Sequence, residues 1–220
     1  MKDSLLIISG WAHGLEAIQP MGDALAEEFN VQLLTGNQVL KEQQIPDTDV
    51  IVTGSMGGLL AMELLPESCK KLVLVSSTAR FCSAAGYACG THEKILKRMI
   101  LQLKRNPEAV LTAFFENVHF PMCESRQAIA NRKQTPISVE ELVSGLEYLL
   151  AADLRSTVPT LGIPVQLFHG LEDRIIPVGA AEWLHENLPN SQLKRYEGQG
   201  HALPAHYFGP VMNSIRDFIV

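Results

Sequence analysis

Short apolar runs alternate along this chain with longer segments in which apolar residues recur at helical spacing. Each run is bounded by glycine or polar residues, which is typical of strands buried inside a parallel sheet. Strands are therefore predicted at residues 4–9, 31–34, 49–53, 72–76, 164–169 and 192–196. Because helical segments separate these strands, the pattern predicts an α/β fold, with a mostly parallel sheet flanked by helices.

Three helical segments are expected to pack against this sheet. Residues 14–29 are predicted to form one helix, and residues 211–219 form an amphipathic helix that closes the chain. The segment after Ser55 is apolar on nearly every side, which is typical of a buried helix.

Residues 80–153 interrupt the alternation, and their pattern is helical throughout. Two apolar stripes cover residues 95–103 and 110–118. The pair Asn106-Pro107 marks the start of the second helix, because asparagine favours the cap position and proline the first turn. This segment is therefore an insertion between two strands of the sheet.

A third helix of the insertion begins with the capping-box pair Ser138 and Glu141. Long insertions in compact domains are mostly functional, and sites of α/β sheets lie at the carboxyl ends of the strands. We therefore expect a core formed by residues 1–79 and 154–220, with a helical lid at 80–153. A helical decoration far from any site is the alternative.

Composition places the chain among ordinary globular proteins. Its 220 residues are 46% hydrophobic and carry a formal net charge of −6, which favours one acidic domain. No apolar run approaches the ~20 residues that span a membrane, and the first run is too short for a signal peptide. The four cysteines lack the histidine spacing of a zinc site. We expect a cytoplasmic monomer that binds neither membranes nor nucleic acid.

A candidate nucleophile lies where a predicted strand turns directly into the buried helix, in the sequence Thr53-Gly54-Ser55-Met56-Gly57. In a nucleophile elbow, the serine occupies a turn so tight that the residues two places away must be small. Gly57 fits this pattern, but Thr53 stands where glycine is usual. The alternative, a phosphate-binding turn, lacks the glycine motifs of known phosphate loops. Ser55 is therefore the predicted nucleophile.

A serine nucleophile needs a histidine base and a carboxylate that orients this base. Asp173 follows the strand predicted at 164–169, and His201 lies in a glycine-flanked loop after the last strand. Both residues therefore come at the carboxyl ends of strands, and the order Ser, Asp, His is that of the α/β-hydrolases. Glu172 is the alternative acid.

Acyl transfer to serine also needs backbone N–H groups directed at the developing oxyanion. Met56, directly after the candidate nucleophile, is one such donor, and Trp11, just after the first predicted strand, is the other. The Trp11 side chain fits either the substrate pocket or the core. Since a serine triad needs no metal and no organic cofactor, neither is expected.

These motifs make the chain similar to the α/β-hydrolase superfamily over nearly its whole length. A closer resemblance is to the biotin-synthesis carboxylesterase family BioH. It is carried by Gly10-Trp11, Ser76-Ser77, the sequence GLEYLL at 145–150 and the sequence DLR at 153–155. The resemblance implies hydrolysis of the methyl ester of pimeloyl-acyl carrier protein, with release of methanol. Compared with that family, the segment 35–49 is short, so we expect its helix to be reduced or lost.

Part of the predicted lid is basic although the chain is acidic. Between residues 91 and 133 the sequence has eight Lys and Arg but four Glu. Such local charge suits an acidic partner, and acyl carrier proteins are acidic as a class. A solvated helix face is the alternative. The candidate docking residues are Lys94, Lys97, Arg98, Arg126 and Arg132.

The candidate apolar lining of the substrate pocket consists of Phe81, Phe114 and Phe115 together with Trp11. Two other functions remain open from the sequence. An esterase or thioesterase for another acyl group would use the same catalytic residues. A non-catalytic ligand receptor on a hydrolase scaffold would need none of them, because a fold does not imply a function. Dehalogenase and epoxide hydrolase chemistry is disfavoured, since those relatives have aspartate in place of Ser55.

Overall fold

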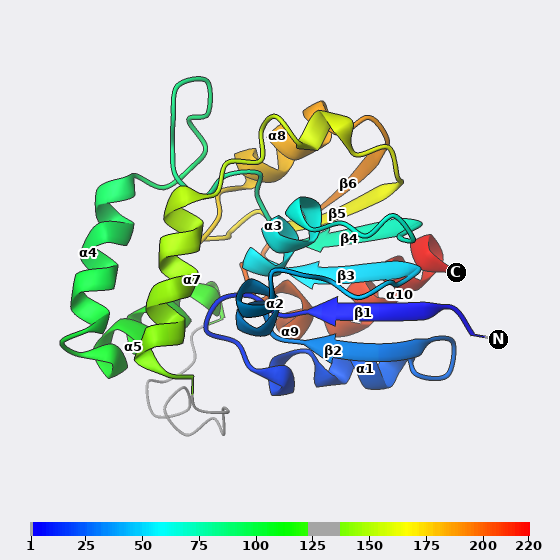
Figure 1. Cartoon of the computed structure of the whole chain (residues 1–220), viewed down its shortest axis with the longest axis horizontal. Helices are drawn as coiled ribbons and strands as arrows, with labels where there is room; N and C mark the ends of the chain where they lie inside the picture. Colours follow the sequence, from blue (N-terminus) through cyan, green and yellow to red (C-terminus); the bar gives the residue numbers. More distant parts are fainter. Residues whose placement is uncertain (1, 123–136) are drawn as a thin grey trace.

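The computed structural model describes residues 2–122 and 137–220, and a six-stranded parallel sheet forms its centre (Figure 1). The strand order is β2-β1-β3-β4-β5-β6, with every neighbouring pair parallel. The strands are β1 (Ser4–Ile8), β2 (Asn30–Leu34), β3 (Val50–Gly54), β4 (Lys71–Val75), β5 (Val165–Gly170) and β6 (Ser191–Tyr196). The six predicted strands are confirmed to within one residue at each end.

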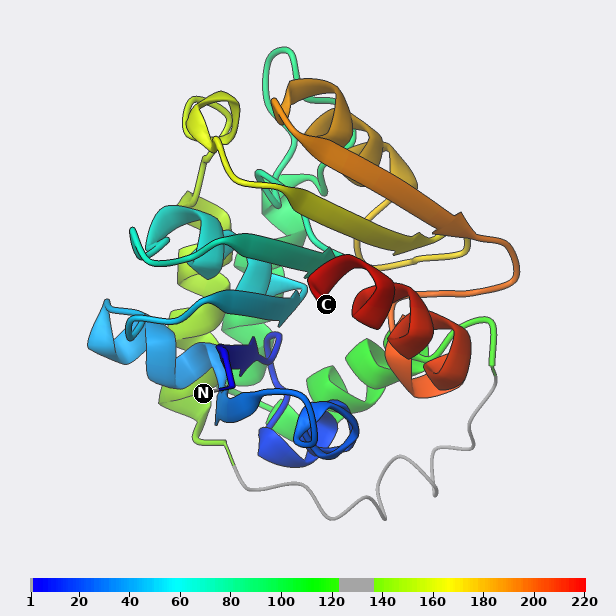
Figure 2. The same ribbon diagram turned by 90° about the vertical axis from the view of Figure 1, so that its right-hand side faces the viewer.

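Helices cover both faces of this sheet, because alternate residues of each strand point to opposite faces. On one face, α1 (Gln19–Leu25), α9 (Leu203–His206) and α10 (Phe208–Ile219) pack on one set of strand residues (Figure 2). On the other, α2 (Gly36–Glu42), α3 (Met56–Glu63) and α8 (Val178–Asn187) pack on the alternate set. Every residue of α3 from Met56 to Met62 is buried, which confirms the predicted buried helix.

The prediction of one helix over residues 14–29 is wrong. The segment contains the short 3₁₀ helix η1 (Leu15–Ala17) and then α1, which ends at Leu25. Pro20 lies in the first turn of α1, where a missing N–H costs nothing, so the proline starts a new helix rather than continuing the first. The reduced helix expected within 35–49 is α2, whose seven residues begin at a capping box.

The helices α4 (Glu93–Leu103), α5 (Pro107–Val118) and α7 (Val139–Ala151) lie beyond the carboxyl ends of the strands (Figure 1). Asn106 caps α5 by accepting a hydrogen bond from the N–H of Ala109 at 3.1 Å. Ser138 and Glu141 form the predicted capping box of α7. These helices belong to the segment that we expected to form a lid. None of the helices in the two described ranges has both the length and the apolar character to cross a membrane.

The two ends of this helical segment meet at the edge of the core. The N–H of Leu154 donates to the carbonyl oxygen of Ala79 at 2.9 Å. Arg80 forms an ion pair with Asp153, which also binds Arg155 at 2.8 Å. The DLR sequence at 153–155 therefore joins the exit of the segment to its entry. The short 3₁₀ helix η2 (Val158–Thr160) then leads back to β5.

Candidate active site

Ser55 occupies a strained turn between β3 and α3. Its φ of 52° and ψ of −118° lie in a region that residues with a side chain rarely adopt, at a cost of about 1–3 kcal/mol. The turn is tight because the chain passes close to β1. A Cβ atom on Gly57 would lie 2.8 Å from the carbonyl oxygens of Ile8 and Ser9, so only glycine fits there. The local sequence thus holds Ser55 at the carboxyl end of the sheet.

Thr53 departs from the usual elbow pattern, and the structure explains why this position accepts it. The side chain is fully buried, and its hydroxyl donates to the carbonyl oxygen of Val73 on β4 at 3.1 Å. The threonine is therefore accommodated between two strands of the sheet, away from the turn that contains Ser55.

Asp173 and His201 lie side by side although they come from different loops. Asp173 follows β5, and His201 follows β6, with Nδ1 of His201 2.7 Å from Oδ2 of Asp173. The other carboxylate oxygen of Asp173 accepts the backbone N–H groups of Ile175 and Ile176 at 2.8 and 2.9 Å. Glu172, the alternative acid, is exposed. The carboxylate beside the histidine is therefore that of Asp173.

The surroundings of Asp173 favour its charged form. Burial alone would raise the pKa of this carboxyl, but the positive charge and the hydrogen bond of His201 lower the pKa below its ordinary value of 3.8. Since a carboxylate only accepts hydrogen bonds, Nδ1 of His201 carries the shared proton. The Nε2 atom of His201 is then the nitrogen that remains for a base.

A second buried histidine, His169, supports the loop that contains Asp173. Its Nε2 lies 2.8 Å from the carbonyl oxygen of Ile176 and 3.4 Å from Oδ2 of Asp173. Burial lowers the pKa of His169 below its ordinary value of 6.5, so this imidazole is neutral at pH 7. His169 therefore packs beneath the acid loop as a structural group.

The loop that carries His201 is held on several sides. The hydroxyl of Ser76, at the end of β4, donates to the carbonyl oxygen of His201 at 3.0 Å. A Cβ atom on Gly170 would lie 2.3 Å from the carbonyl oxygen of Gln199, and one on Gly200 would overlap the carbonyl oxygen of Phe120. The loop is therefore packed between β5 and the segment after α5, which fixes the position of the imidazole.

Trp11 and Met56, the two candidate oxyanion residues, both contact helix α7. The indole N–H of Trp11 donates to the carbonyl oxygen of Leu142 at 2.8 Å. A Cβ atom on Gly145 would lie 2.5 Å from Cδ1 of Trp11 and 3.5 Å from Sδ of Met56. Gly145, the first residue of the GLEYLL sequence, thus gives both side chains room to pack against α7.

This contact makes Gly145 a sensitive position. In Gly145→Ala the new methyl group must displace Trp11 or α7, because the indole is rigid and hydrogen-bonded. A shift of about 1 Å in a positioning residue costs about 10²-fold in rate, so we expect kcat for a small ester to fall by about that factor. Steady-state kinetics of the purified variant measures the effect.

The matched control is Gly209→Ala, also a glycine-to-alanine change within a helix. A Cβ atom at Gly209 would meet nothing within 4 Å, and α10 lies on the face of the sheet opposite to the buried helix α3. The Gly209→Ala enzyme should keep its activity and gain a little stability from helix propensity. An unchanged kcat in Gly145→Ala would show that the α7 contact does not position the Trp11 loop.

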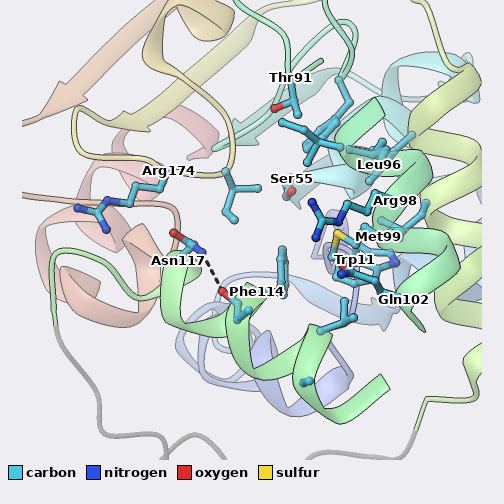
Figure 3. A pocket seen from close by; sticks show the side chains of 18 of the residues that line it. Trp11, Ser55, Thr91, Leu96, Arg98, Met99, Gln102, Phe114, Asn117 and Arg174 are labelled. Carbon is cyan, nitrogen blue, oxygen red and sulfur yellow. Dashed lines mark hydrogen bonds between the residues drawn. The ribbon is translucent and has the colours of Figure 1, made fainter. Parts of the chain in front are cut away.

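Ser55 opens onto a cavity of about 720 Å³ between the end of the sheet and the three helices (Figure 3). This volume falls within the range of roughly 300–1,000 Å³ that is usual for small-molecule sites. Trp11, Phe81 and Phe114 line the cavity. Phe115 does not, which corrects the prediction. It lies one position further round α5, is 4% exposed, and packs on the rings of His13 and His119.

The predicted docking residues are distributed unevenly in the structure. Lys94 and Lys97 are exposed on α4, where Lys97 pairs with Glu93 at 3.0 Å. Arg98 lines the cavity instead of facing only solvent. Arg126 and Arg132 lie outside the described residues.

Sequence reasoning missed Arg105 and Arg174, which also line the cavity. Arg105 comes seven residues after Arg98, a spacing at which residues of a helical pattern share one face, and the structure places it in the turn directly after α4. That spacing was a signal available in the sequence. Arg174 directly follows Asp173, so it is carried to the cavity by the loop that holds the candidate acid.

Comparison with known sequences finds a matching family model and relatives that share one name. The family model described as serine aminopeptidase, S33, matches residues 27–205. A protein of Aromatoleum aromaticum named pimeloyl-[acyl-carrier protein] methyl ester esterase is 31% identical over 174 residues, covering 72% of this chain and 69% of that protein. A protein of Nitrosomonas europaea with the same name is 31% identical over 222 residues, covering 90% of this chain and 88% of that protein.

Comparison with solved structures identifies the fold. An esterase from Exiguobacterium antarcticum matches with a TM-score of 0.83 at 19% identity, covering 99% of this chain and 92% of that one. A metagenomic enzyme described as an α/β hydrolase matches with a TM-score of 0.78 at 14% identity, covering 99% of this chain and 90% of that one. At these identities the likeness shows the fold alone, and it confirms the predicted α/β-hydrolase fold.

Proposed function

Because the chain belongs to the serine aminopeptidase S33 family and to the family of the pimeloyl-[acyl-carrier protein] methyl ester esterases, we propose that it hydrolyses the methyl ester of pimeloyl-acyl carrier protein in biotin synthesis. One observation carries the proposal: a strained serine lines a largely apolar cavity in a fold that also holds a buried Asp173–His201 pair. The enzyme is accordingly a serine carboxylesterase with Ser55 as nucleophile.

In the proposed reaction, Oγ of Ser55 attacks the ester carbonyl carbon while Nε2 of His201 accepts the hydroxyl proton. The backbone N–H groups of Trp11 and Met56 donate to the resulting oxyanion. Asp173 stabilises the imidazolium and keeps the proton of Nδ1 in place, as the 2.7 Å contact favours. The ester C–O bond then breaks, and His201 protonates the departing methoxide to give methanol.

The second half of the reaction regenerates the enzyme. Water attacks the acyl group on Ser55 while His201 removes one water proton, and the same two N–H groups hold the new oxyanion. The bond to Ser55 breaks, His201 returns the proton to Oγ, and the free carboxylic acid leaves. All protons and electron pairs in this scheme come from the chain, the ester and water.

The lining of the cavity fits an extended acyl chain. Next to Ser55 and Trp11 it presents Leu96, Met99 and Phe114. Trp11 and Phe114 meet edge to face with ring centroids 4.7 Å apart, which gives a continuous apolar wall. A run of methylene groups is stabilised by burial against such a wall, at about 0.8 kcal/mol per CH₂.

Methanol release from the methyl ester of pimeloyl-acyl carrier protein tests the proposal directly, with a short p-nitrophenyl ester assayed in parallel. Rapid cleavage of the carrier-bound ester supports the proposed substrate. Cleavage of the p-nitrophenyl ester alone keeps the serine chemistry and points to another acyl substrate. If neither is cleaved and a fluorophosphonate probe fails to label folded protein, a non-catalytic ligand receptor replaces the proposal.

Salt tests the proposed carrier-protein partner. Lys94 and Arg98 are exposed on α4 and would attract an acidic carrier before contact. Raising salt from about 0.05 M to about 0.5 M should lower kcat/KM for the carrier-bound ester by about tenfold, since salt screens exposed charges. The value for the neutral p-nitrophenyl ester should change by less than about twofold. Equal responses would contradict docking through this basic surface.

A further inference from the structure

The charged side chains that line the catalytic cavity, among the described residues, are all positive. Arg98, Arg105 and Arg174 line it, and of the residues that the structure describes no aspartate or glutamate does so. The chain as a whole has a net charge of −6. A neutral acyl ester has no charged group that three positive side chains could bind. The three arginines therefore indicate that the ligand carries negative charge in addition to its ester group.

The three arginines are not equivalent. The guanidinium of Arg174 lies over the ring of Phe120, 3.1 Å from the ring centroid, and Figure 3 shows it directed away from Ser55. Arg98 extends from α4 into the cavity toward the side where Ser55 lies (Figure 3). Arg98 and Arg105 are therefore the stronger candidates for contact with a ligand.

Arg98 lies on α4, and Arg105 lies in the turn that directly follows the end of this helix at Leu103. Both residues line the same cavity. Both side chains are exposed, and neither forms an ion pair with any residue in the described ranges. Their donors are therefore available to an anion, and a guanidinium binds phosphate oxygens through two parallel hydrogen bonds.

Carboxamide side chains also line the cavity. Gln102 and Asn106 flank Arg105 in sequence, whereas Asn117 comes from the other end of α5 and lies beside Arg174 (Figure 3). The side-chain oxygen of Asn106 caps α5, which leaves its NH₂ group as a donor. The carboxamide of Gln102 has both a donor and an acceptor. Donors and acceptors of this kind match the amide groups of a peptide-like chain.

We propose that Arg98 and Arg105 form an anion subsite in the wall of the catalytic cavity that binds the phosphodiester of a phosphopantetheine arm, while Gln102 and Asn106 bind the amides of that arm. The inference rests on the proposed function, because a carrier-bound acyl group is attached through such an arm. The enzyme then recognises the arm itself in addition to any contact with the carrier protein.

The test uses two small substrates that differ by one phosphate. One is the methyl ester of pimeloyl-pantetheine, which is neutral, and the other is the methyl ester of pimeloyl-4′-phosphopantetheine. For the wild type, we expect the phosphate to raise kcat/KM by about tenfold or more, the usual effect of a hydrogen bond to a charged group. In Arg98→Gln and in Arg105→Gln this ratio should fall, and in the double variant it should approach one.

The ratio within each variant cancels any general loss of active protein. Lys104→Gln is the matched control, because Lys104 is exposed beside Arg105 and does not line the cavity. It removes the same charge from the same end of α4, and its ratio should equal that of the wild type. A comparable fall in Lys104→Gln would show a diffuse field in place of a subsite and would overturn the proposal.

Two further outcomes separate this proposal from the proposed function. If the wild type cleaves both substrates at equal kcat/KM, the subsite is refuted while the esterase stands. The same holds if Arg98→Gln and Arg105→Gln impair only the intact carrier substrate, since the arginines then bind acidic side chains of the carrier. If neither small substrate nor the carrier-bound ester is cleaved, the proposed function itself fails.

Discussion

The Ser55→Ala enzyme is expected to hydrolyse esters about 10⁶-fold more slowly than the wild type, because loss of the nucleophile removes the covalent route altogether. Its fold should be retained, since alanine at φ 52° meets the same steric strain as serine. Burst and steady-state assays with the p-nitrophenyl ester measure the loss, and circular dichroism checks the fold. Activity within about tenfold of the wild type would exclude Ser55 as nucleophile.

Ser55→Gly is the informative partner of this variant. It removes the same hydroxyl, but glycine adopts positive φ without steric cost, so the strain of about 1–3 kcal/mol is relieved. The greater chain entropy of unfolded glycine offsets part of this gain. We expect Ser55→Gly to be as inactive as Ser55→Ala and more stable than it by about 1 kcal/mol, or about 2–4 °C in Tm. Equal Tm values would show that the turn stores no strain.

The sheet could be predicted well because its strands are buried on both faces. Such strands are continuous apolar runs, and Leu5 to Ile8 and Val50 to Val52 are nearly inaccessible in the structure. The mistake over residues 14–29 has a different origin. A continuous amphipathic pattern does not reveal a break, and the proline at position 20 that starts α1 lies inside that pattern.

The catalytic candidates were predictable because their chemistry is tied to strand ends. Ser55, Asp173 and His201 each follow a strand, and parallel strands end at the same edge of a sheet. Gly145 is a contrasting case. The sequence shows Gly145 only as part of a motif. A glycine is needed there because α7 packs closely against Trp11, in the loop after β1, and the sequence pattern does not reveal this contact.

The walls of the cavity were the least predictable part. Phe114 and Phe115 are adjacent in one apolar stripe, and no periodicity decides which of them faces the substrate. The packing of α5 decides it, because Phe115 fills the space beside His13 and His119 and leaves Phe114 against Trp11. Tertiary contacts of this kind are set by side chains that are distant in sequence.

The Asp173→Asn enzyme should lose about 10⁴-fold in kcat while keeping its structure. The backbone N–H groups of Ile175 and Ile176 hold Oδ1, so the amide oxygen of asparagine will take that place. The NH₂ group then faces Nδ1 of His201, which must accept a hydrogen bond and lose its proton. The imidazole proton moves to Nε2, and this nitrogen can no longer accept the proton of Ser55.

Glu172→Gln separates this tautomer effect from a general loss of negative charge in the acid loop. Glu172 is adjacent to Asp173 but exposed, so its charge is screened by solvent and its replacement should change kcat by less than about twofold. The pH profile gives the second readout. Glu172→Gln should keep the pH profile of the wild type, whereas Asp173→Asn should stay low at every pH because its histidine holds the wrong tautomer. A strong loss in Glu172→Gln with activity retained in Asp173→Asn would instead assign the acid to Glu172.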